Sequence, residues 1–432
     1  MAKLYLGTAR EIITPKIGGQ LYGYDPYVKS ETVEDDLTVT ALYFKQNDTQ
    51  TLMLSATVCL IGTDLANDIL SRIENKFGIP KENCMLSATH THSGPNTCGQ
   101  VGWGDIDREY CDGIFIPAIL SAVEKAMSDP VAVRMGVATG DSLVGINRRE
   151  LKQTNQVKLG QNPWGAFDPK MTVISFKDSA DKTVANIIHY GTHGTAAGKN
   201  HEITRDWSGR MIDALEKQSG AITAFFNGPE GDVGPRLSNG KTVGDITHVR
   251  ALGALAAKDA LRVFSDITEY RDIDLAVSHK TLAVPLKKRV DMSVAKEQLE
   301  EYKEKTVNHA GMTRAHLESV IESYQNGYID KDVCEVEQTV IAFGDVLFAS
   351  FPYELFSEIG MRINNAFETK KVLSLSNTNG SEGYFITEDA ICRGGYEVTM
   401  FLYGHLQQFV DDADFHLMLE TVEHINTLIS EE

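Results

Sequence analysis

The sequence predicts an α/β fold: a mixed β-sheet core flanked by helices. Apolar runs of strand length alternate with segments of helical spacing over all 432 residues. The composition is that of an ordinary globular enzyme, with 42% hydrophobic and 23% charged residues. No repeat or linker interrupts this alternation. We therefore expect one large domain that covers residues 1–432.

The first part of the chain is rich in predicted strands. An apolar run with a turn at residues 46–50 predicts a hairpin between the strands on either side of it. The predicted strands are residues 4–7, 11–13, 37–44, 51–60, 84–88 and 131–137. The predicted helices are residues 64–77 and 110–127.

The later part of the chain continues the alternation. Strands are predicted at residues 171–176, 184–190, 221–227, 340–343, 346–350 and 372–376. Helices are predicted to open at Arg205, to cover residues 247–263, to start near Tyr353, and to close the chain at 412–429.

A change of composition marks residues 287–329. Lys and Glu are dense there, Gly is scarce, and helical spacing runs through residues 292–305 and 314–324. We predict a helical insertion of two surface helices. A plain solvated pair is the favoured interpretation, and a lid with a function is the alternative.

The charge balance limits the classes of partner. The net charge is −19 and the isoelectric point is near 5.1. An acidic protein does not attract nucleic acid or an anionic membrane surface, so neither is expected as a main partner. A local basic pocket remains compatible with this balance.

The cysteines and the apolar runs indicate a compartment. Six cysteines show no metal-binding or redox spacing, and we interpret them as reduced thiols. The opening residues show no secretion signal, and no apolar run approaches the roughly 20 residues of a membrane span. A cytoplasmic protein is therefore expected. The sequence carries no signal for an oligomeric state.

Two histidines follow the strand at residues 84–88. His90 and His92 are two residues apart, and in an extended segment such residues point to the same face. Both could therefore bind one metal ion at the edge of the sheet. The alternative is a pair of hydrogen-bonded loop histidines, because two-residue motifs are common by chance.

Three further strand ends carry candidate ligands. His193 follows the strand at 184–190, Glu354 follows 346–350, and Tyr384 lies in the loop after 372–376, with Tyr396 beyond it. Imidazoles, a carboxylate and a phenol suit a borderline divalent cation, and zinc fits this set best. An open position would remain for water, as a hydrolytic zinc requires.

Each candidate has an alternative interpretation. Glu354 could be a first-turn glutamate favoured by the helix dipole, and Tyr384 could be a buried tyrosine with a satisfied hydroxyl. His189 lies inside an apolar strand and is interpreted as a core histidine. His201 and His405 have no identifiable companions in the sequence.

Taken together, these stretches resemble the neutral, non-lysosomal ceramidase family over nearly the whole chain. The most specific motif is THTHSGP at residues 89–95. The other matching stretches are the ITP of the opening, the Gly- and Tyr-rich loop that includes residues 22–26, and residues 147–148, 193–195, 204–206, 231–235, 351–354, 383–387 and 395–397.

The resemblance implies roles for particular residues. It implies a zinc ion held by His90, His193, Glu354 and Tyr384. It also implies that His92 supports the metal ligands or lies close to the reacting atoms. Arg148 and Tyr396 would contact the substrate or the developing oxyanion, and Asp232 would be a structural carboxylate or one that supports the ligands.

One departure from the family pattern changes the expected mechanism. The serine that the family offers as nucleophile or substrate ligand is Gly234 here. Glycine has no side-chain oxygen, so no acyl-serine can form, and attack must come from metal-bound water. The signal and the C-terminal β-sandwich of secreted members are also missing. The expectation is a cytoplasmic offshoot whose substrate is not ceramide itself.

The leading hypothesis is a zinc-dependent hydrolase of a linear amide: an N-acyl compound, including ceramide-like lipids of sphingolipid metabolism. His92 is the first choice for the base, and Arg148 or Tyr396 would stabilise the oxyanion. Gly234 motivates one alternative, a metal-stabilised binding protein without catalysis. The absent signal motivates another, a hydrolase of an ester or a small polar amide.

Overall fold

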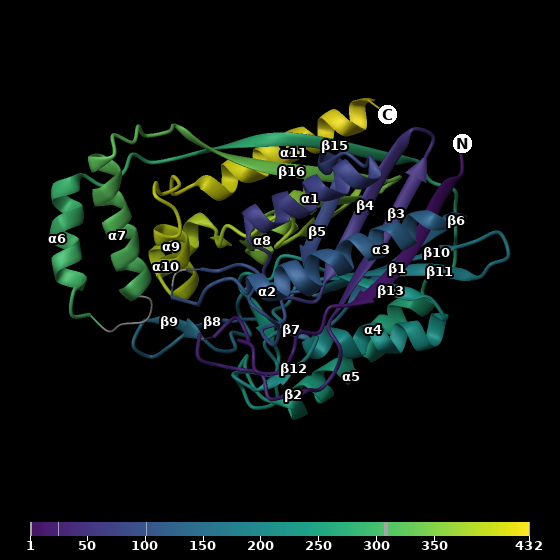
Figure 1. Cartoon of the computed structure of the whole chain (residues 1–432), viewed down its shortest axis with the longest axis horizontal. Helices are drawn as coiled ribbons and strands as arrows, with labels where there is room; N and C mark the ends of the chain where they lie inside the picture. The colour runs from purple at the N-terminus through teal and green to yellow at the C-terminus, as the bar shows by residue number, and fades with distance from the viewer. Residues whose placement is uncertain (1, 25, 101, 306–309, 432) are drawn as a thin grey trace.

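Two β-sheets stacked face to face, with helices on both outer sides, form the molecule (Figure 1). The computed structural model describes residues 2–431 except 25, 101 and 306–309. Residue 25 of the Gly- and Tyr-rich loop and residues 306–309 of the helical insertion therefore lie outside the described residues. The predicted α/β class with a mixed sheet and flanking helices is confirmed, although the core contains two sheets rather than one.

The first sheet has eight strands and is mixed. Only its two ends are parallel, at β4–β5 and β11–β13, and the strands between them are antiparallel. The predicted hairpin around residues 46–50 is confirmed as β3–β4. In spatial order the strands are β13 (Ile222–Asn227), β11 (Thr183–Tyr190), β10 (Lys170–Lys177), β6 (Val131–Asp141), β1 (Leu4–Ile12), β3 (Thr38–Gln46), β4 (Thr49–Ala56) and β5 (Cys84–Ala88).

The second sheet has four strands and lies against the inner face of the first. Its strands are β15 (Leu275–Pro285), β16 (Val333–Phe343), β17 (Val346–Ser350) and β19 (Lys371–Leu375). Aromatic rings fill the space between the sheets: the ring centroid of Phe343 lies 4.6 Å from that of Phe44 and 6.1 Å from that of Phe176. This dry layer is the central core, and burial of its large apolar side chains stabilises the sandwich.

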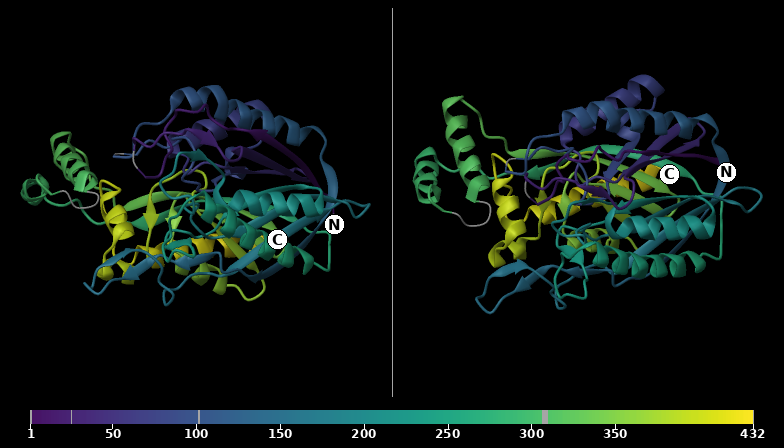
Figure 2. Two further views of the ribbon diagram at one scale, coloured as in Figure 1. Left: turned by 90° about the horizontal axis from the view of Figure 1, so that it is seen from below. Right: turned by 60° about the horizontal axis from the view of Figure 1, so that its bottom comes forward.

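Helices cover the outer faces of both sheets (Figure 2). α1 (Thr63–Phe77) and α3 (Ile116–Ser128) pack on the β1–β5 half of the first sheet. α4 (Asp206–Ser219) and α5 (Ile246–Ser265) pack on its other half. α8 (Ser357–Asn365) and α11 (Ala413–Glu431) cover the second sheet.

Two helix predictions need correction. Residues 110–127 do not form one helix: α2 (Arg108–Tyr110) leads into a π-helical turn, Cys111–Phe115, before α3 starts. Pro117 has no N–H to donate to the carbonyl four residues earlier, which favours the wider turn at this point. The helix expected near Tyr353 starts only at Ser357.

The two helices predicted within residues 287–329 are present as α6 (Met292–Tyr302) and α7 (Ala310–Gln325). They form a hairpin that projects from one end of the molecule, beyond β15 and β16 and away from both termini (Figures 1 and 2). α7 also contacts α10 (Tyr396–Tyr403), where the rings of His316 and Tyr403 are 5.3 Å apart. The helix pair α6–α7 is therefore not surrounded by solvent on all sides, as the favoured interpretation of residues 287–329 had it.

The remaining expectations concern thiols and membranes. All six cysteines are free thiols, as predicted. No helix formed by the described residues combines the length and the apolarity that crossing a lipid bilayer requires.

Candidate metal centre and active site

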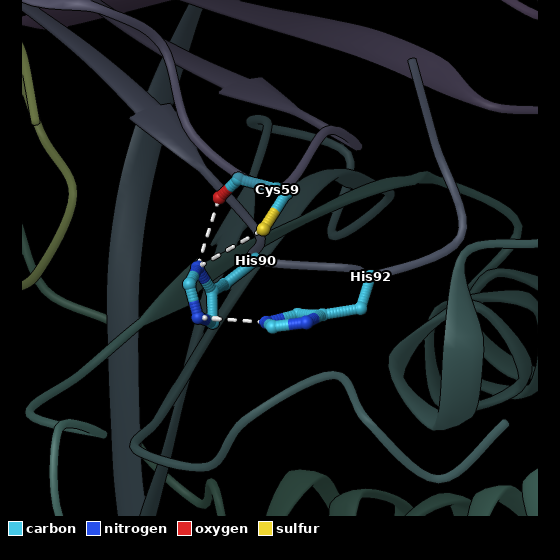
Figure 3. A group of neighbouring side chains, drawn as sticks. All are labelled: Cys59, His90 and His92. Carbon is cyan, nitrogen blue, oxygen red and sulfur yellow. Dashed lines mark hydrogen bonds between the residues drawn. The ribbon is translucent and has the colours of Figure 1, made fainter. Parts of the chain in front are cut away.

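His90 is held with one ring nitrogen free. It follows β5 in a left-handed conformation, with φ +67°, so the regular extended geometry predicted for residues 90–92 is wrong. Its Nδ1 lies 2.9 Å from the carbonyl oxygen of Cys59 and donates to it. The Nε2 atom is therefore the unprotonated one, and it lies 3.2 Å from Nε2 of His92 (Figure 3).

His193 is oriented in the same way from a different strand. It lies in the loop that follows β11, and its Nδ1 is 2.8 Å from the carbonyl oxygen of Glu230 and 3.1 Å from that of Val233. Two backbone acceptors fix the proton on Nδ1. Nε2 is buried and has no hydrogen-bond partner among the described residues.

Glu354 and Tyr384 lie opposite each other on two paired strands. β18 (Glu354–Leu355) runs parallel to β20 (Tyr384–Phe385), with Glu354 opposite Tyr384. Glu354 lies before α8, so the first-turn interpretation of this residue is excluded. Its Oε2 lies 3.1 Å from Nε2 of His193 and 3.5 Å from Nε2 of His90.

Three atoms with free lone pairs thus face one another in a buried space. Oε2 of Glu354 and Nε2 of His193 have no hydrogen-bond partner among the described residues, although both are buried. Burial lowers the pKa of His90 and His193, so both imidazoles are neutral at pH 7. Converging acceptors without a proton between them repel one another unless a cation is present. The donor set of two imidazoles and a carboxylate suits zinc.

A second possible group does not converge in the same way. Cys59, His90 and His92 lie close together, but the Cys59 sulfur is 3.8 Å from Nδ1 of His90, whereas His92 faces Nε2 on the opposite side of the ring (Figure 3). One ion cannot lie on both sides of the imidazole, so Cys59 is excluded. His92, by contrast, lies on the side of His90 that faces Glu354. The site that fits a cation is therefore the one formed by His90, His193 and Glu354.

Arg148 connects Tyr384, a predicted ligand, to Glu397, an acid for which the sequence predicts no role. Its NH2 donates to the Tyr384 hydroxyl at 2.9 Å, and its Nε donates to Glu397 at 2.9 Å. Arg149 binds the other oxygen of Glu397 at 2.7 Å. Burial alone would lower the pKa of Arg148, but the phenol and the Glu397 carboxylate raise it, so the guanidinium stays charged.

His92 and Tyr396 complete the wall of the site. Nδ1 of His92 lies 3.0 Å from the carbonyl oxygen of Gly23, and burial with two imidazole neighbours lowers its pKa well below the ordinary range. Tyr396 opens α10, and its ring centroid lies 5.6 Å from that of Tyr384 and 6.0 Å from Cζ of Arg148. Both residues face the cavity beside the three ligand atoms.

That cavity has a volume of about 740 Å³, enough for a substrate much larger than a single metabolite ring. Five predicted site residues line it: His92, Arg148, His193, Tyr384 and Tyr396. Tyr24, Trp103, Val157, Leu159 and Val243 add apolar surface.

Gly234 and Asp232 lie on β14 (Val233–Pro235) or next to it. A Cβ at position 234 would lie 2.7 Å from Cβ of Thr242, which itself lines the cavity. Asp232 accepts hydrogen bonds from the backbone N–H of Ser357 at 2.7 Å and from Nδ2 of Asn147 at 3.2 Å. Burial raises the pKa of Asp232 to about 6. These bonds join β14 to the start of α8, so Asp232 occupies a structural position.

Sequence reasoning did not find Glu230, Asn377, Thr242 and Glu397 as site residues. Glu230 and Asn377 lie behind the imidazoles, and Thr242 comes from a loop with no strand-end signal. Two of them stand inside or beside motifs that were recognised, at residues 231–235 and 395–397. An isolated polar residue carries no distance information, so the available signals were proximity to a motif and, for Asn377, its position directly after the predicted strand at 372–376.

Sequence comparison identifies the family. The sequence model of the neutral/alkaline non-lysosomal ceramidase N-terminal region matches residues 6–250, more than half of the chain. The chain belongs to this family. The matched region contains His90, Arg148 and His193, whereas Glu354 and Tyr384 lie beyond it.

Several neutral ceramidases are similar in sequence over part of their length. Neutral ceramidase A of Dictyostelium discoideum is 27% identical over 219 residues, which is 45% of this chain and 30% of the relative. Neutral ceramidase of Mycobacterium tuberculosis is 26% identical over 217 residues, 45% of this chain and 33% of the relative. The matched part is thus about a third of these relatives.

Solved ceramidase structures share the fold of this chain along its entire length. The crystal structure of neutral ceramidase from Pseudomonas aeruginosa superimposes with a TM-score of 0.78 and 18% identity, covering 100% of this chain and 75% of that one. A ceramidase complexed with C2 gives a TM-score of 0.77 at 16% identity, with 100% and 76% coverage. The shared fold therefore includes β18 and β20, which carry Glu354 and Tyr384.

Proposed function

We propose that the protein is a zinc-dependent hydrolase of linear amides, acting on N-acyl compounds that include ceramide-like lipids. The observation that supports this most directly is the convergence of His90, His193 and Glu354, because Nε2 of His193 and Oε2 of Glu354 are buried without a hydrogen-bond partner among the described residues. Membership of the ceramidase family supports amide hydrolysis.

The proposed ligands are His90, His193, Glu354 and Tyr384. Zinc bound by them would lower the pKa of a water molecule and polarise the amide carbonyl. Tyr384 reaches this set through its strand pairing with Glu354. Without a cation, burial holds the pKa of its phenol well above the ordinary range, and a divalent charge next to the oxygen would favour the phenolate.

The groups beside the ligands can supply the remaining chemistry. Arg148 is charged and donates toward the ligand side of the cavity, where a tetrahedral oxyanion would develop. Tyr396 offers a second hydroxyl in the same wall. Nδ1 of His92 donates to the Gly23 carbonyl, so its Nε2 is free to accept a proton from attacking water.

Position 234 determines how the amide can be attacked. Glycine there provides no oxygen nucleophile, so no covalent acyl-enzyme forms at this position. Water is therefore the proposed nucleophile, in a single displacement on the acyl carbon.

Metal analysis and turnover together test the proposal. Purified wild-type protein should bind one equivalent of zinc, and His193→Ala should lose most of it. A panel of N-acyl compounds should be hydrolysed by the zinc-loaded wild type, and Glu354→Ala should abolish this turnover. Zinc well below one equivalent in both proteins would end the metal hypothesis. Stoichiometric zinc without any turnover would favour the metal-stabilised binding protein.

A further inference from the structure

The active-site cavity is positively charged in a strongly acidic protein. Three basic side chains line it: Arg148, Lys158 and Arg393. No Asp or Glu is found among the described residues of its lining, although the chain has 60 acidic and 41 basic residues. Glu354 lies behind the cavity wall, where the proposed cation would neutralise its carboxylate charge.

Lys158 lies on the cavity side of a thin wall. β8 (Arg149–Leu151) and β9 (Val157–Leu159) form a hairpin that begins directly after Arg148. A second cavity beside this hairpin is lined by Arg149 and Leu151, Val157 lines both cavities, and Lys158 does not line the second one. Of the two cavities, Lys158 therefore borders only the active-site cavity.

The charge of Lys158 has no acidic partner in the described part of the chain. Its cross-strand neighbour Glu150 binds Lys152 instead, at 2.5 Å. No ion pair involves Lys158 among the described residues. Arg393, by contrast, pairs with Asp389 at 2.7 Å.

Glu354 and Glu397 are buried behind the cavity lining. Arg148 and Arg149 share the single carboxylate of Glu397. Two guanidinium groups thus face one acid, close to the position proposed for a divalent cation. A half-enclosed cavity of one sign concentrates ligands of the opposite sign.

We propose that the amide substrate carries a carboxylate, as an N-acyl amino acid does, and that this carboxylate binds at the β8–β9 wall beside Lys158. This inference rests on the proposed amide hydrolase function. The apolar residues Val243 and Trp103 would then contact the acyl chain, while the carboxylate provides the selectivity over neutral N-acyl lipids. An exposed lysine–carboxylate contact changes affinity by roughly fivefold.

A matched pair of probes tests the charge preference. N-dodecanoylglycine and N-dodecanoylethanolamine differ in a carboxylate against a hydroxymethyl group. Wild type should show a higher kcat/KM for the glycine compound. Lys158→Gln should reduce the ratio of the two values roughly fivefold, and Lys158→Glu should reverse the preference. Lys217→Gln, at the exposed end of α4, is the control and should leave the ratio as in wild type.

Two further measurements keep the test decisive. Dissociation constants of both probes, measured by calorimetry, should follow the same pattern and do not depend on turnover. Added salt should weaken the preference of wild type and not that of Lys158→Gln. Equal ratios in wild type and Lys158→Glu, in both kinetics and binding, would overturn the inference. A different result would count against the proposed function instead: zinc-loaded wild type binds the glycine compound more tightly but hydrolyses neither probe.

Discussion

Glu230 is a buried acid next to the proposed ligands His90 and His193. Its Oε1 accepts a hydrogen bond from Nδ2 of Asn377 at 2.6 Å, and that nitrogen lies 3.3 Å from Nδ1 of His90. Its backbone carbonyl accepts from Nδ1 of His193. Burial and the nearby Glu354 raise its pKa well above the ordinary range. Glu230 therefore binds the His193 ring through its backbone carbonyl and places Asn377 beside the His90 ring through its side chain.

Removal of this side chain should weaken metal binding without unfolding the protein. Outer contacts of metal-bound histidines typically change metal affinity by about 10- to 100-fold, so Glu230→Ala should lose zinc affinity in this range. Glu230→Gln keeps a partner for Asn377 and should recover most of it. Competition with a chelator measures the affinity, and Glu297→Ala on α6 is an exposed control. Unchanged affinity in Glu230→Ala would contradict the expectation.

The space for a side chain at position 234 is occupied. A Cβ there would lie 2.7 Å from both Cβ and Cγ2 of Thr242. Gly234→Ser should therefore lower the free energy of unfolding by about 1 to 3 kcal/mol. Thr242→Gly should relieve the clash, which gives a favourable coupling in a double-mutant cycle measured by urea unfolding. If the two substitutions change the free energy of unfolding additively, the loop that carries Thr242 moves aside without an energetic penalty, and the expected clash is absent.

At the level of elements, the start of α4 holds the His193 loop. The side chain of Asp206 accepts from the backbone N–H groups of Ala196, Ala197 and Trp207 at 3.2, 2.9 and 2.7 Å. The indole N–H of Trp207 then donates to the His193 carbonyl at 3.0 Å. The prediction that a helix opens near Arg205 is confirmed, and its first residue proves to be a structural anchor.

Asp206→Ala should remove three acceptors at once. We expect a loss of about 2 to 3 kcal/mol in the free energy of unfolding, because buried N–H groups are left without partners. Asp206→Asn keeps one carbonyl oxygen and should fall between Asp206→Ala and wild type. Urea unfolding of the three proteins measures this order. A difference below about 0.5 kcal/mol between wild type and Asp206→Ala would show that water replaces the carboxylate.

Elements with strong periodicity were predictable, and those set by context were not. The strand at residues 84–88 has the predicted bounds because its apolar run ends at a polar loop. β15 was not predicted, because exposed and buried residues alternate only over residues 281–284 in its second half, whereas residues 275–280 are mostly half-buried and show no such pattern. Glu354 was assigned correctly to a strand end, but the two-residue strand β18 depends on its partner β20, which no local pattern reveals.

At the level of the whole molecule, a histidine joins the two sheets. His189 of β11 donates from Nε2 to the carbonyl oxygen of Ser374 in β19, at 2.9 Å. Burial lowers its pKa to about 4. Its interpretation as a core histidine agrees with this position between the sheets.

This depressed pKa predicts a pH dependence of stability. The unfolded chain, in which the His189 pKa is about 6.5, binds more protons than the native protein between pH 4 and 6.5. The contribution is therefore fully present above about pH 6.5 and is lost as the pH falls toward 4, by up to about 3 kcal/mol. Urea unfolding across this range should show a smaller decrease for His189→Gln than for wild type. Asp206, whose pKa is raised to about 6, contributes the opposite slope in both proteins and cancels in the comparison.

The stacking of two sheets could not be predicted from the sequence. Periodicity shows that a strand has a buried face, but it does not show which sheet covers that face. The predicted ligands were nevertheless brought together, because His90 and His193 end strands of the first sheet while Glu354 and Tyr384 follow strands of the second. Thr242 and Asn377 reach the site from loops, where only the tertiary structure determines proximity.

This division of the ligands between the sheets has a consequence for biosynthesis. A nascent chain completed only through α5 carries both imidazoles but neither Glu354 nor Tyr384. At 5 to 20 residues per second, the ribosome adds Tyr384 roughly 10 to 40 s after His193. Cation capture by the full set of ligands must therefore wait for nearly complete translation, so an occupied site would mark a chain whose two sheets have both been made and have docked.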